Sequence, residues 1–241
     1  MKIFLTLAYL FFIGSVLGWV LELLFRNLCH RTKKWINPGF CTGPYVPLYG
    51  FGLCILYLLA SVEHHLPFSS PFWRSVAVIV LMGVAMTVLE YIAGLLCLRI
   101  AKVRLWDYSK QWGNIQGIIC PLFSLAWAVL GGIYDLFVHP HIENAMASLS
   151  QSQGFTFLVG LFFGVFLVDV GHSIQLTAKL KKFAEENAVI LRYESIKAHI
   201  RAAQSNRALR FHFFTPFRSV HSLSEHLREM YTIPGKSRKR W

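Results

Sequence analysis

WVLELLFRNLCHRTKKWINPGFCTGPYVPLYGFG, residues 19–52, joins a glutamate inside an apolar helix to a basic loop and then to a second apolar helix that opens with glycines and prolines. A degraded copy of this unit follows. Residues 20–22 correspond to residues 88–90, and both segments are Val-Leu-Glu. Residues 43–49 correspond to residues 117–123, and both segments are Gly-x-x-x-Pro-Leu followed by an aromatic residue. The matching spacings favour internal duplication of a helical hairpin over chance similarity between two apolar hairpins. Duplication with an ionisable residue inside each copy is found among membrane transporters, where it tends to mark the functional centre.

The composition requires lipid as the solvent. Of the 241 residues, 55% are hydrophobic and only 15% are charged, and the mean hydropathy is +0.47. A soluble core would not hide this much apolar surface. The five cysteines form no CxxC pair and their number is odd, so we interpret them as free thiols.

Hydrophobic patterning predicts an all-α, polytopic membrane helical bundle with five transmembrane helices. These are two similar helical hairpins plus a fifth helix, followed by a basic cytoplasmic tail. The predicted spans are residues 3–25, 46–62, 72–98, 115–138 and 155–176. Gly14, Gly18 and Glu22 fall on one face of the first span, which we expect to pack against protein.

The distribution of lysine and arginine predicts the orientation. The first and third loops hold four each and the tail holds fourteen, whereas the second and fourth loops are nearly bare. By the positive-inside rule the N-terminus lies outside and the C-terminus in the cytoplasm, as a multi-pass protein of the cytoplasmic (inner) cell membrane.

The tail, residues 177–241, carries fourteen basic and five acidic residues. Its first half is rich in helix formers and is expected to extend the fifth span. Further on, apolar residues at helical spacing predict an amphipathic helix lying on anionic lipid. These are Phe211, Phe213, Phe214, Phe217, Val220, Leu223 and Leu227, and the basic residues 236–240 follow them. The alternative is a basic tail that binds no surface. Nucleic acid is disfavoured because no recognisable binding module accompanies the charge.

Three carboxylates inside predicted spans are candidates for binding a substrate or an ion: Glu22, Glu90 and Asp169. A carboxylate within a bilayer is costly unless it is paired, hydrated or protonated, so these side chains are expected to hold a cation or relay a proton. The alternative is a structural role, in which they hydrogen-bond the starts of spans two and four. The two interpretations carry equal weight for Glu22, whereas Glu90 lies deeper and is the stronger functional candidate.

The helix-breaking segments before spans two and four supply the remaining candidates. Short, Gly/Pro-interrupted segments at matching positions of two repeats point to a binding site, because a helix N-terminus there offers unpaired N–H groups. A tight interfacial turn without a ligand is the equally weighted alternative. The residues concerned are Asn37, Gly43, Pro47, Asn114 and Gly117.

Other chemistries find little support. The external loops contain Glu63, His64, His65, His139, His141 and Glu143. No HxxxH or HExxH spacing occurs among them, so no metal site is predicted. Residues 235–237, Gly-Lys-Ser, resemble the end of a phosphate-binding loop, but Met230 stands where its first glycine belongs. The chain therefore contains no ATPase, and with no G-x-S-x-G or other nucleophile pattern we favour a protein that is not an enzyme and expect no cofactor.

Several motifs together carry a family resemblance: residues 18–22 (Gly-Trp-Val-Leu-Glu), 37–40 (Asn-Pro-Gly-Phe), 43–50 (Gly-Pro-Tyr-Val-Pro-Leu-Tyr-Gly), Glu90, and the segment from Trp106-Asp107-Tyr108 to Asn114-x-x-Gly117. With these the chain resembles the putative ABC-transporter type IV permeases, a family of bacterial membrane proteins, over roughly its first 130 residues. The resemblance implies transport driven by a separate ATPase subunit, although the sequence shows no EAA-type coupling loop.

Our hypothesis is a permease-like component of a transport system, in which Glu22 and Glu90 face a cytoplasm-open cavity roofed by the starts of spans two and four. A membrane enzyme acting on lipid headgroups, and a non-catalytic scaffold whose tail binds lipid or a partner, are the alternatives. A homo-oligomer is compatible with all three hypotheses.

Overall fold

The computed structural model describes residues 2–29, 37–63, 66–203, 217 and 222–231. Its elements are α1 (Lys2–Cys29), α2 (Pro47–Ser61), α3 (Pro71–Ile100), β1 (Val103–Arg104), α4 (Pro121–Ile133), the π-helix η2 (Tyr134–Val138), α5 (His139–Gln151), α6 (Gln153–Glu186), β2 (Leu191–Arg192), α7 (Tyr193–Ala203) and α8 (Leu223–Tyr231). Some residues singled out above lie outside the described part of the chain: His64, His65, Phe211, Phe213, Phe214, Val220 and residues 236–240.

Within the described part of the chain, four helical segments are long and apolar enough to cross a membrane: Ile3–Asn27, Pro71–Ile100, Pro121–Ile142 and Gln153–Glu186. A fifth apolar helix, α2, has only 15 residues. At a rise of ~1.5 Å per residue it spans about 22 Å, less than the hydrocarbon thickness of a typical bilayer. The chain is therefore a mostly helical, multi-pass membrane protein with four candidate spans and one shorter apolar helix.

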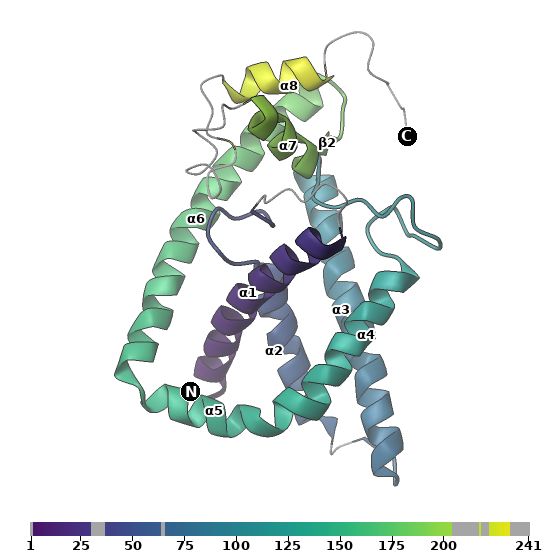
Figure 1. The fold of residues 1–241 in the computed structure, drawn as a ribbon, viewed down its shortest axis with the longest axis vertical. Coiled ribbons are helices and arrows are strands. Elements are labelled where there is room, and N and C mark those ends of the chain that lie inside the picture. The colour runs from purple at the N-terminus through teal and green to yellow at the C-terminus, as the bar shows by residue number, and fades with distance from the viewer. Residues whose placement is uncertain (1, 30–36, 64–65, 204–216, 218–221, 232–241) are drawn as a thin grey trace.

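The long helices run between two ends of the molecule (Figure 1). One end, here called the tail end, carries β1, β2, α7 and α8, and the other carries the N-terminus and α5. The predicted fourth loop is largely helical instead, because α4 continues through η2 directly into α5. Pro140 lies in the first turn of α5, directly after the π-helix η2.

The two predicted hairpins are the most extensive helix pairs of the bundle, α1 with α2 and α3 with α4. Both returning helices begin at a proline, Pro47 and Pro121, whose fixed φ suits the first helical position. Small residues bring each pair together. A Cβ atom at Gly18 would overlap Tyr49 of α2, and one at Gly83 would contact Ala128 of α4. The glycine-bearing faces thus pack against protein, as the sequence predicted.

Two predicted boundaries differ from the structure. The fourth span begins at Pro121 rather than at residue 115, because Ile115 and Ile119 form an antiparallel bridge around Gly117, whose φ is +67°. The fifth helix runs on to Glu186, which confirms the expected extension into the tail. A boundary between residues 176 and 177 therefore falls inside α6.

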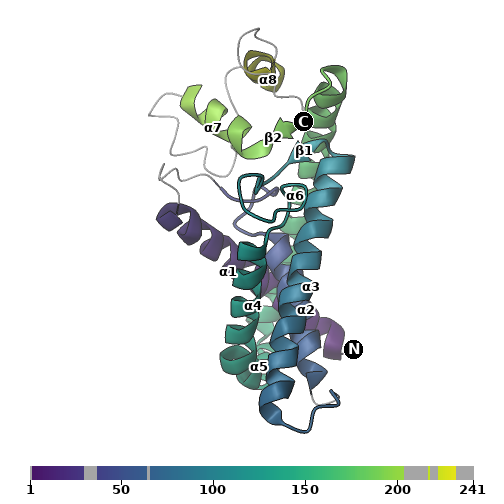
Figure 2. The ribbon, with the colours of Figure 1, turned by 90° about the vertical axis from the view of Figure 1, so that its right-hand side faces the viewer.

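The segment after α6 folds onto the loop that follows α3. β1 and β2 pair in parallel, with Val103 beside Leu191. Around this pair lies an apolar core formed by α6, α7 and α8, with β1, α7 and α8 at the tail end (Figure 2). Its most deeply buried members are Val103, Leu180, Leu191, Ile196, Ile200 and Leu227. The apolar side of α8, including Leu227, thus packs on protein.

We predict that Gly18→Ala weakens the first hairpin. The new methyl group overlaps the Cβ and ring of Tyr49, so α2 must move away from α1. Overpacking of this kind costs about 1–3 kcal/mol and should lower the melting temperature of the purified protein. Gly171→Ala on α6 is the matched control, because nothing lies within 4 Å of its added methyl group. Equal melting temperatures for the two variants would contradict the predicted packing.

Candidate functional site

The first carboxylate, Glu22 on α1, is held by two donors. Arg26, one turn later on the same helix, donates its Nε–H to Oε1 at 2.8 Å. The hydroxyl of Tyr49 donates to Oε2, also at 2.8 Å. Tyr49 lies in the first turn of α2 because that helix begins at Pro47, and the absence of a side chain at Gly18 lets it approach α1. Glu22 therefore ties the two helices of the first hairpin together.

The second carboxylate, Glu90 on α3, is buried, with 4% of its surface exposed. The Tyr108 hydroxyl donates to Oε1 at 3.0 Å, and the Trp127 Nε1–H donates to Oε2 at 2.9 Å. Trp127 comes from α4 and Tyr108 from the loop between α3 and α4. Both are neutral donors, in contrast to the arginine that neutralises Glu22.

The two carboxylates belong to one polar cluster at the interface between the hairpins. The rings of Tyr49 and Trp127, one donor from each hairpin, lie 5.6 Å apart. Burial raises the pKa of Tyr108, and the charge of Glu90, its hydrogen bond to Glu90 and the charge of Glu22 raise it further. The charges of both glutamates therefore act on the pKa of one hydroxyl group, that of Tyr108. We call Glu22, Tyr49, Glu90, Tyr108 and Trp127 the two-glutamate cluster.

Asn114 and Gly117 build the loop that holds Tyr108 rather than joining the cluster. The Asn114 Oδ1 accepts from the Gly117 N–H at 3.0 Å, and its Nδ2 donates to the carbonyls of Ser109 and Gln111. The Gly117 carbonyl accepts from the Tyr108 N–H at 2.9 Å. A side chain at Gly117 would be strained by its positive φ and would meet the Arg104 guanidinium. These two candidates therefore position a donor of Glu90.

Asp107 strengthens the same loop. Its Oδ1 accepts from Arg104 at 2.9 Å and from the Ser109 N–H at 3.1 Å, and its Oδ2 lies 3.1 Å from the Arg192 guanidinium of β2. Burial raises the pKa of Asp107, but these hydrogen bonds and the charge of Arg104 outweigh it and hold the pKa below its usual value. The loop that carries Tyr108 is thereby joined to the segment after α6.

Asn37 organises the loop between α1 and α2. It is buried, and its Oδ1 accepts from the Trp19 Nε1–H at 2.7 Å while its Nδ2 donates to the Thr42 carbonyl at 2.7 Å. Its own carbonyl accepts from the Lys197 ammonium of α7 at 2.9 Å. Asn37 thus links the loop to α1 on one side and to the tail on the other.

A chain of ionic contacts connects the two-glutamate cluster to α7. Arg26 donates its Nε–H to Glu22. Its Nη1–H group donates to Glu194 of α7 at 2.8 Å. Glu194 in turn lies 3.4 Å from the Lys197 ammonium, which also donates to the Gly39 carbonyl at 2.9 Å. The Lys197 side chain is only 2% exposed, and burial lowers its pKa although the charge of Glu194 opposes this shift. We call this chain, Glu22–Arg26–Glu194–Lys197, the tail latch.

Asp169 on α6 lies outside the two-glutamate cluster. Its carboxylate accepts from the Thr42 and Gly43 N–H groups at 2.9 Å and from the Tyr45 hydroxyl. Asp169 therefore fixes the Gly/Pro loop before α2 against α6. A groove of about 880 Å³ opens beside Asp169 along α6. Its lining is apolar at Gly160 and Val168 and polar at Asp169 and His172. The full lining is Thr42, Gly160, Leu161, Gly164, Val165, Val168, Asp169, His172, Ser173, Leu176 and Phe217.

The structure thus groups the sequence candidates in three ways. Glu22 and Glu90 share one cluster, Asn37, Gly43 and Asp169 meet at the loop before α2, and Asn114 and Gly117 support Tyr108. Pro47 starts α2, and neither α2 nor α4 has a side-chain cap at its N-terminus.

Six contributing residues were not predicted: Arg26, Tyr49, Tyr108, Trp127, Glu194 and Lys197. Tyr49 and Tyr108 lie in the motifs quoted above, so those motifs were an available signal. The tail around Lys197 is basic, and its composition gave no signal that Lys197 is buried.

We predict that Tyr108→Phe destabilises the protein. It removes one of the two hydrogen bonds to a buried carboxylate, a loss of about 1.5–3 kcal/mol for a bond to a charged group. Tyr91→Phe on α3 is the control, because the described residues offer its hydroxyl no partner. The melting temperatures of the two variants in detergent test this, and an unchanged value for Tyr108→Phe would rule out the hydrogen bond to Glu90.

We predict energetic coupling across the tail latch. In a double-mutant cycle, Arg26→Met and Glu194→Met should couple by about 1–2 kcal/mol, because their contact is partly buried. The matched cycle, Lys182→Met with Glu186→Met, examines a highly exposed pair and should couple by less than about 0.5 kcal/mol. Coupling no larger than that of the control pair would show that α7 is not held through Arg26.

The comparisons with known proteins agree with the membrane architecture. The family model described as Putative ABC-transporter type IV matches residues 9–174, which include both hairpins and most of α6. No curated protein and no solved structure matches the chain. Since the match covers more than half of the sequence, the chain belongs to the putative ABC-transporter type IV family.

Proposed function

We propose that this chain is the membrane-embedded, permease-like component of a transport system whose ATPase is a separate subunit. Its family membership and its apolar helices support a transport-related membrane protein. The observation that carries the proposal further is the two-glutamate cluster, in which a carboxylate from each hairpin reaches the interface between the hairpins. Ionisable residues inside the membrane at a repeat interface are typical of substrate and ion pathways.

Glu90 is the group that we assign to a proton or a small cation. Among the described residues its donors, Tyr108 and Trp127, are neutral, so a cation binds it without first displacing a positive side chain. Glu22 is already neutralised by Arg26. Glu90 is buried in this conformation, which differs from the open cavity expected from the sequence. Access then requires Tyr108 and Trp127 to move, and both lie on the second hairpin or its loop.

We assign the tail end to the cytoplasmic side of the cell membrane and the N-terminus to the outer side. Lys102, Arg104 and Lys110 lie in the loop at the tail end, and α7 adds Lys197 and Arg201. The segment from residue 139 to 151 at the opposite end contains no lysine or arginine. Under the positive-inside rule this asymmetry supports the proposed orientation, in which the basic tail faces anionic lipid headgroups.

Affinity purification of the intact assembly in mild detergent, followed by mass spectrometry of all its protein and lipid, tests the proposal. We expect an ATPase chain in stoichiometric amount. Recovery of this chain with lipid alone would overturn the proposal of an ATPase-driven permease.

We predict that Glu90→Gln abolishes coupled activity and leaves membrane insertion intact. The amide retains the volume of the carboxylate but loses its charge, and an interaction of about 1.5–3 kcal/mol corresponds to at least about tenfold in rate. ATP hydrolysis by the assembly reconstituted in liposomes is the measurement. Glu63→Gln, which changes a carboxylate that accepts from Ser75 on the first turn of α3, is the control. Hydrolysis at the normal rate by Glu90→Gln would mean that this carboxylate is not the working group.

The groove along α6 favours a second candidate function, the handling of an amphiphilic lipid. Its apolar lining suits an acyl chain, and Asp169, His172 and Ser173 in the same lining suit a polar headgroup. Incubation of the purified protein with labelled phospholipid separates the two functions. A lipid-active enzyme should convert the lipid, and His172→Gln should abolish this turnover. Recovery of intact lipid from the unmodified protein would rule this function out.

A further inference from the structure

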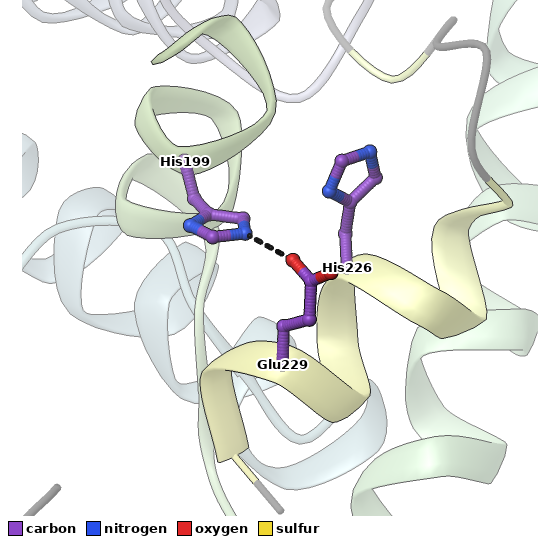
Figure 3. A group of neighbouring side chains, drawn as sticks. All are labelled: His199, His226 and Glu229. Atoms are coloured by element: carbon purple, nitrogen blue, oxygen red, sulfur yellow. Dashed lines mark hydrogen bonds and ion pairs between the residues drawn. The ribbon is translucent and has the colours of Figure 1, made fainter. Parts of the chain in front are cut away.

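Two histidines and a glutamate meet between α7 and α8, far from the two-glutamate cluster in the sequence. His199 comes from α7, and His226 and Glu229 lie three residues apart on α8 (Figure 3). The His199 ring points across to the Glu229 carboxylate, with Nε2 3.3 Å from Oε2. One ligand atom from each of the three side chains lies within 4.8 Å of the others.

The separation of His199 and Glu229 is that of two ligands in a zinc coordination shell. Two ligand atoms on a tetrahedral Zn²⁺ with bonds of about 2.0–2.1 Å lie about 3.3 Å apart. That is the observed separation of His199 Nε2 and Glu229 Oε2, which is long for a charge-assisted hydrogen bond. The ring centroids of His199 and His226 are 5.5 Å apart, and two imidazoles on one tetrahedral ion lie about 5 Å apart. The widest separation must shorten by roughly 1.5 Å when the ion binds.

The surroundings also suit a metal ligand set. His226 is buried, with 2% of its surface exposed, whereas the side chains of His199 and Glu229 are 34% and 60% exposed. The buried histidine gives the site a fixed wall, and the exposed pair leaves a route for the ion. Two imidazoles and one carboxylate are borderline ligands of the kind that Zn²⁺ prefers, and a three-residue set leaves the fourth position to water.

We infer that His199, His226 and Glu229 form a site for a zinc-class divalent cation that clamps α8 onto α7. α7 also carries Glu194 and Lys197, so a clamp at this site holds the helix that reaches Glu22 through the tail latch. The site does not depend on the proposed transport function, because it rests on the ligand geometry alone.

Metal content of the full chain, purified without a histidine tag, tests the inference. The protein is stripped with a chelator, loaded with Zn²⁺, dialysed and analysed by atomic emission, and its affinity is measured by calorimetry. We expect one zinc per chain. Loss of a partner outside the ligand shell already weakens metal binding about 10–100-fold, so His199→Gln and Glu229→Gln, which remove a ligand, should weaken it by at least about 100-fold. His141→Gln, which removes an exposed histidine of α5, should bind as the unmodified chain does.

His199 and Glu229 are chosen because they are partly exposed, so their replacement leaves the buried core intact; equal melting temperatures without zinc check this. Cobalt substitution gives a second measurement. Co²⁺ in this site should give the visible absorption of a four-coordinate ion, and His199→Gln should abolish it. A chain that retains no zinc, or a His199→Gln variant that retains one equivalent with unchanged affinity, would overturn the inference.

Discussion

The burial of the Glu90 carboxylate is the constraint on which the bundle depends. An ionised carboxylate within apolar helices costs several kcal/mol unless donors replace its water. Those donors, Tyr108 and Trp127, come from a loop and from the facing helix. The loop must therefore fold over the end of α3, and Asn114 and Gly117 give it that shape. One buried carboxyl group thus links the packing of α3 on α4 to the path of the chain between them.

The two hairpins satisfy their carboxylates in different ways although their sequences correspond. Phe123 occupies the position of Tyr49 and has no hydroxyl to donate. Its ring instead stacks on Tyr108, with centroids 4.4 Å apart, and Tyr108 supplies the hydroxyl to Glu90. The substitution moves the donor from the rigid first turn of a helix to a loop. Since loops open at lower free energy than packed helices, the Tyr108 donor of Glu90 is easier to displace than the Tyr49 donor of Glu22.

Much of the architecture could be predicted from the sequence because it rests on local signals. Apolar runs and prolines located the helices, and the repeated Val-Leu-Glu motif located Glu22 and Glu90. The start of α4 was missed because residues 115–120 are apolar, yet their bridge depends on the positive φ of Gly117, which hydropathy does not show. The contacts of Lys197 and Glu194 were also missed. Both residues have the charge pattern of a solvated helix face, and only the tertiary fold places them against Asn37 and Arg26.

The tail is joined to the membrane helices by an ion pair and by the hydrogen bonds of a buried ammonium group. Lys197 is buried, and its ammonium depends on the carbonyls of Asn37 and Gly39, both in the loop before α2. Removal of α7 would leave Arg26 paired with Glu22 alone. The other glutamate of the cluster, Glu90, has no cationic partner among the described residues. The same loop is fixed on its other side by Asp169. A movement of α7 is therefore transmitted to α1 through Arg26 and to α6 through the loop. The tail thus contacts the first hairpin through Arg26, and a partner that displaces α7 breaks the Arg26–Glu194 ion pair.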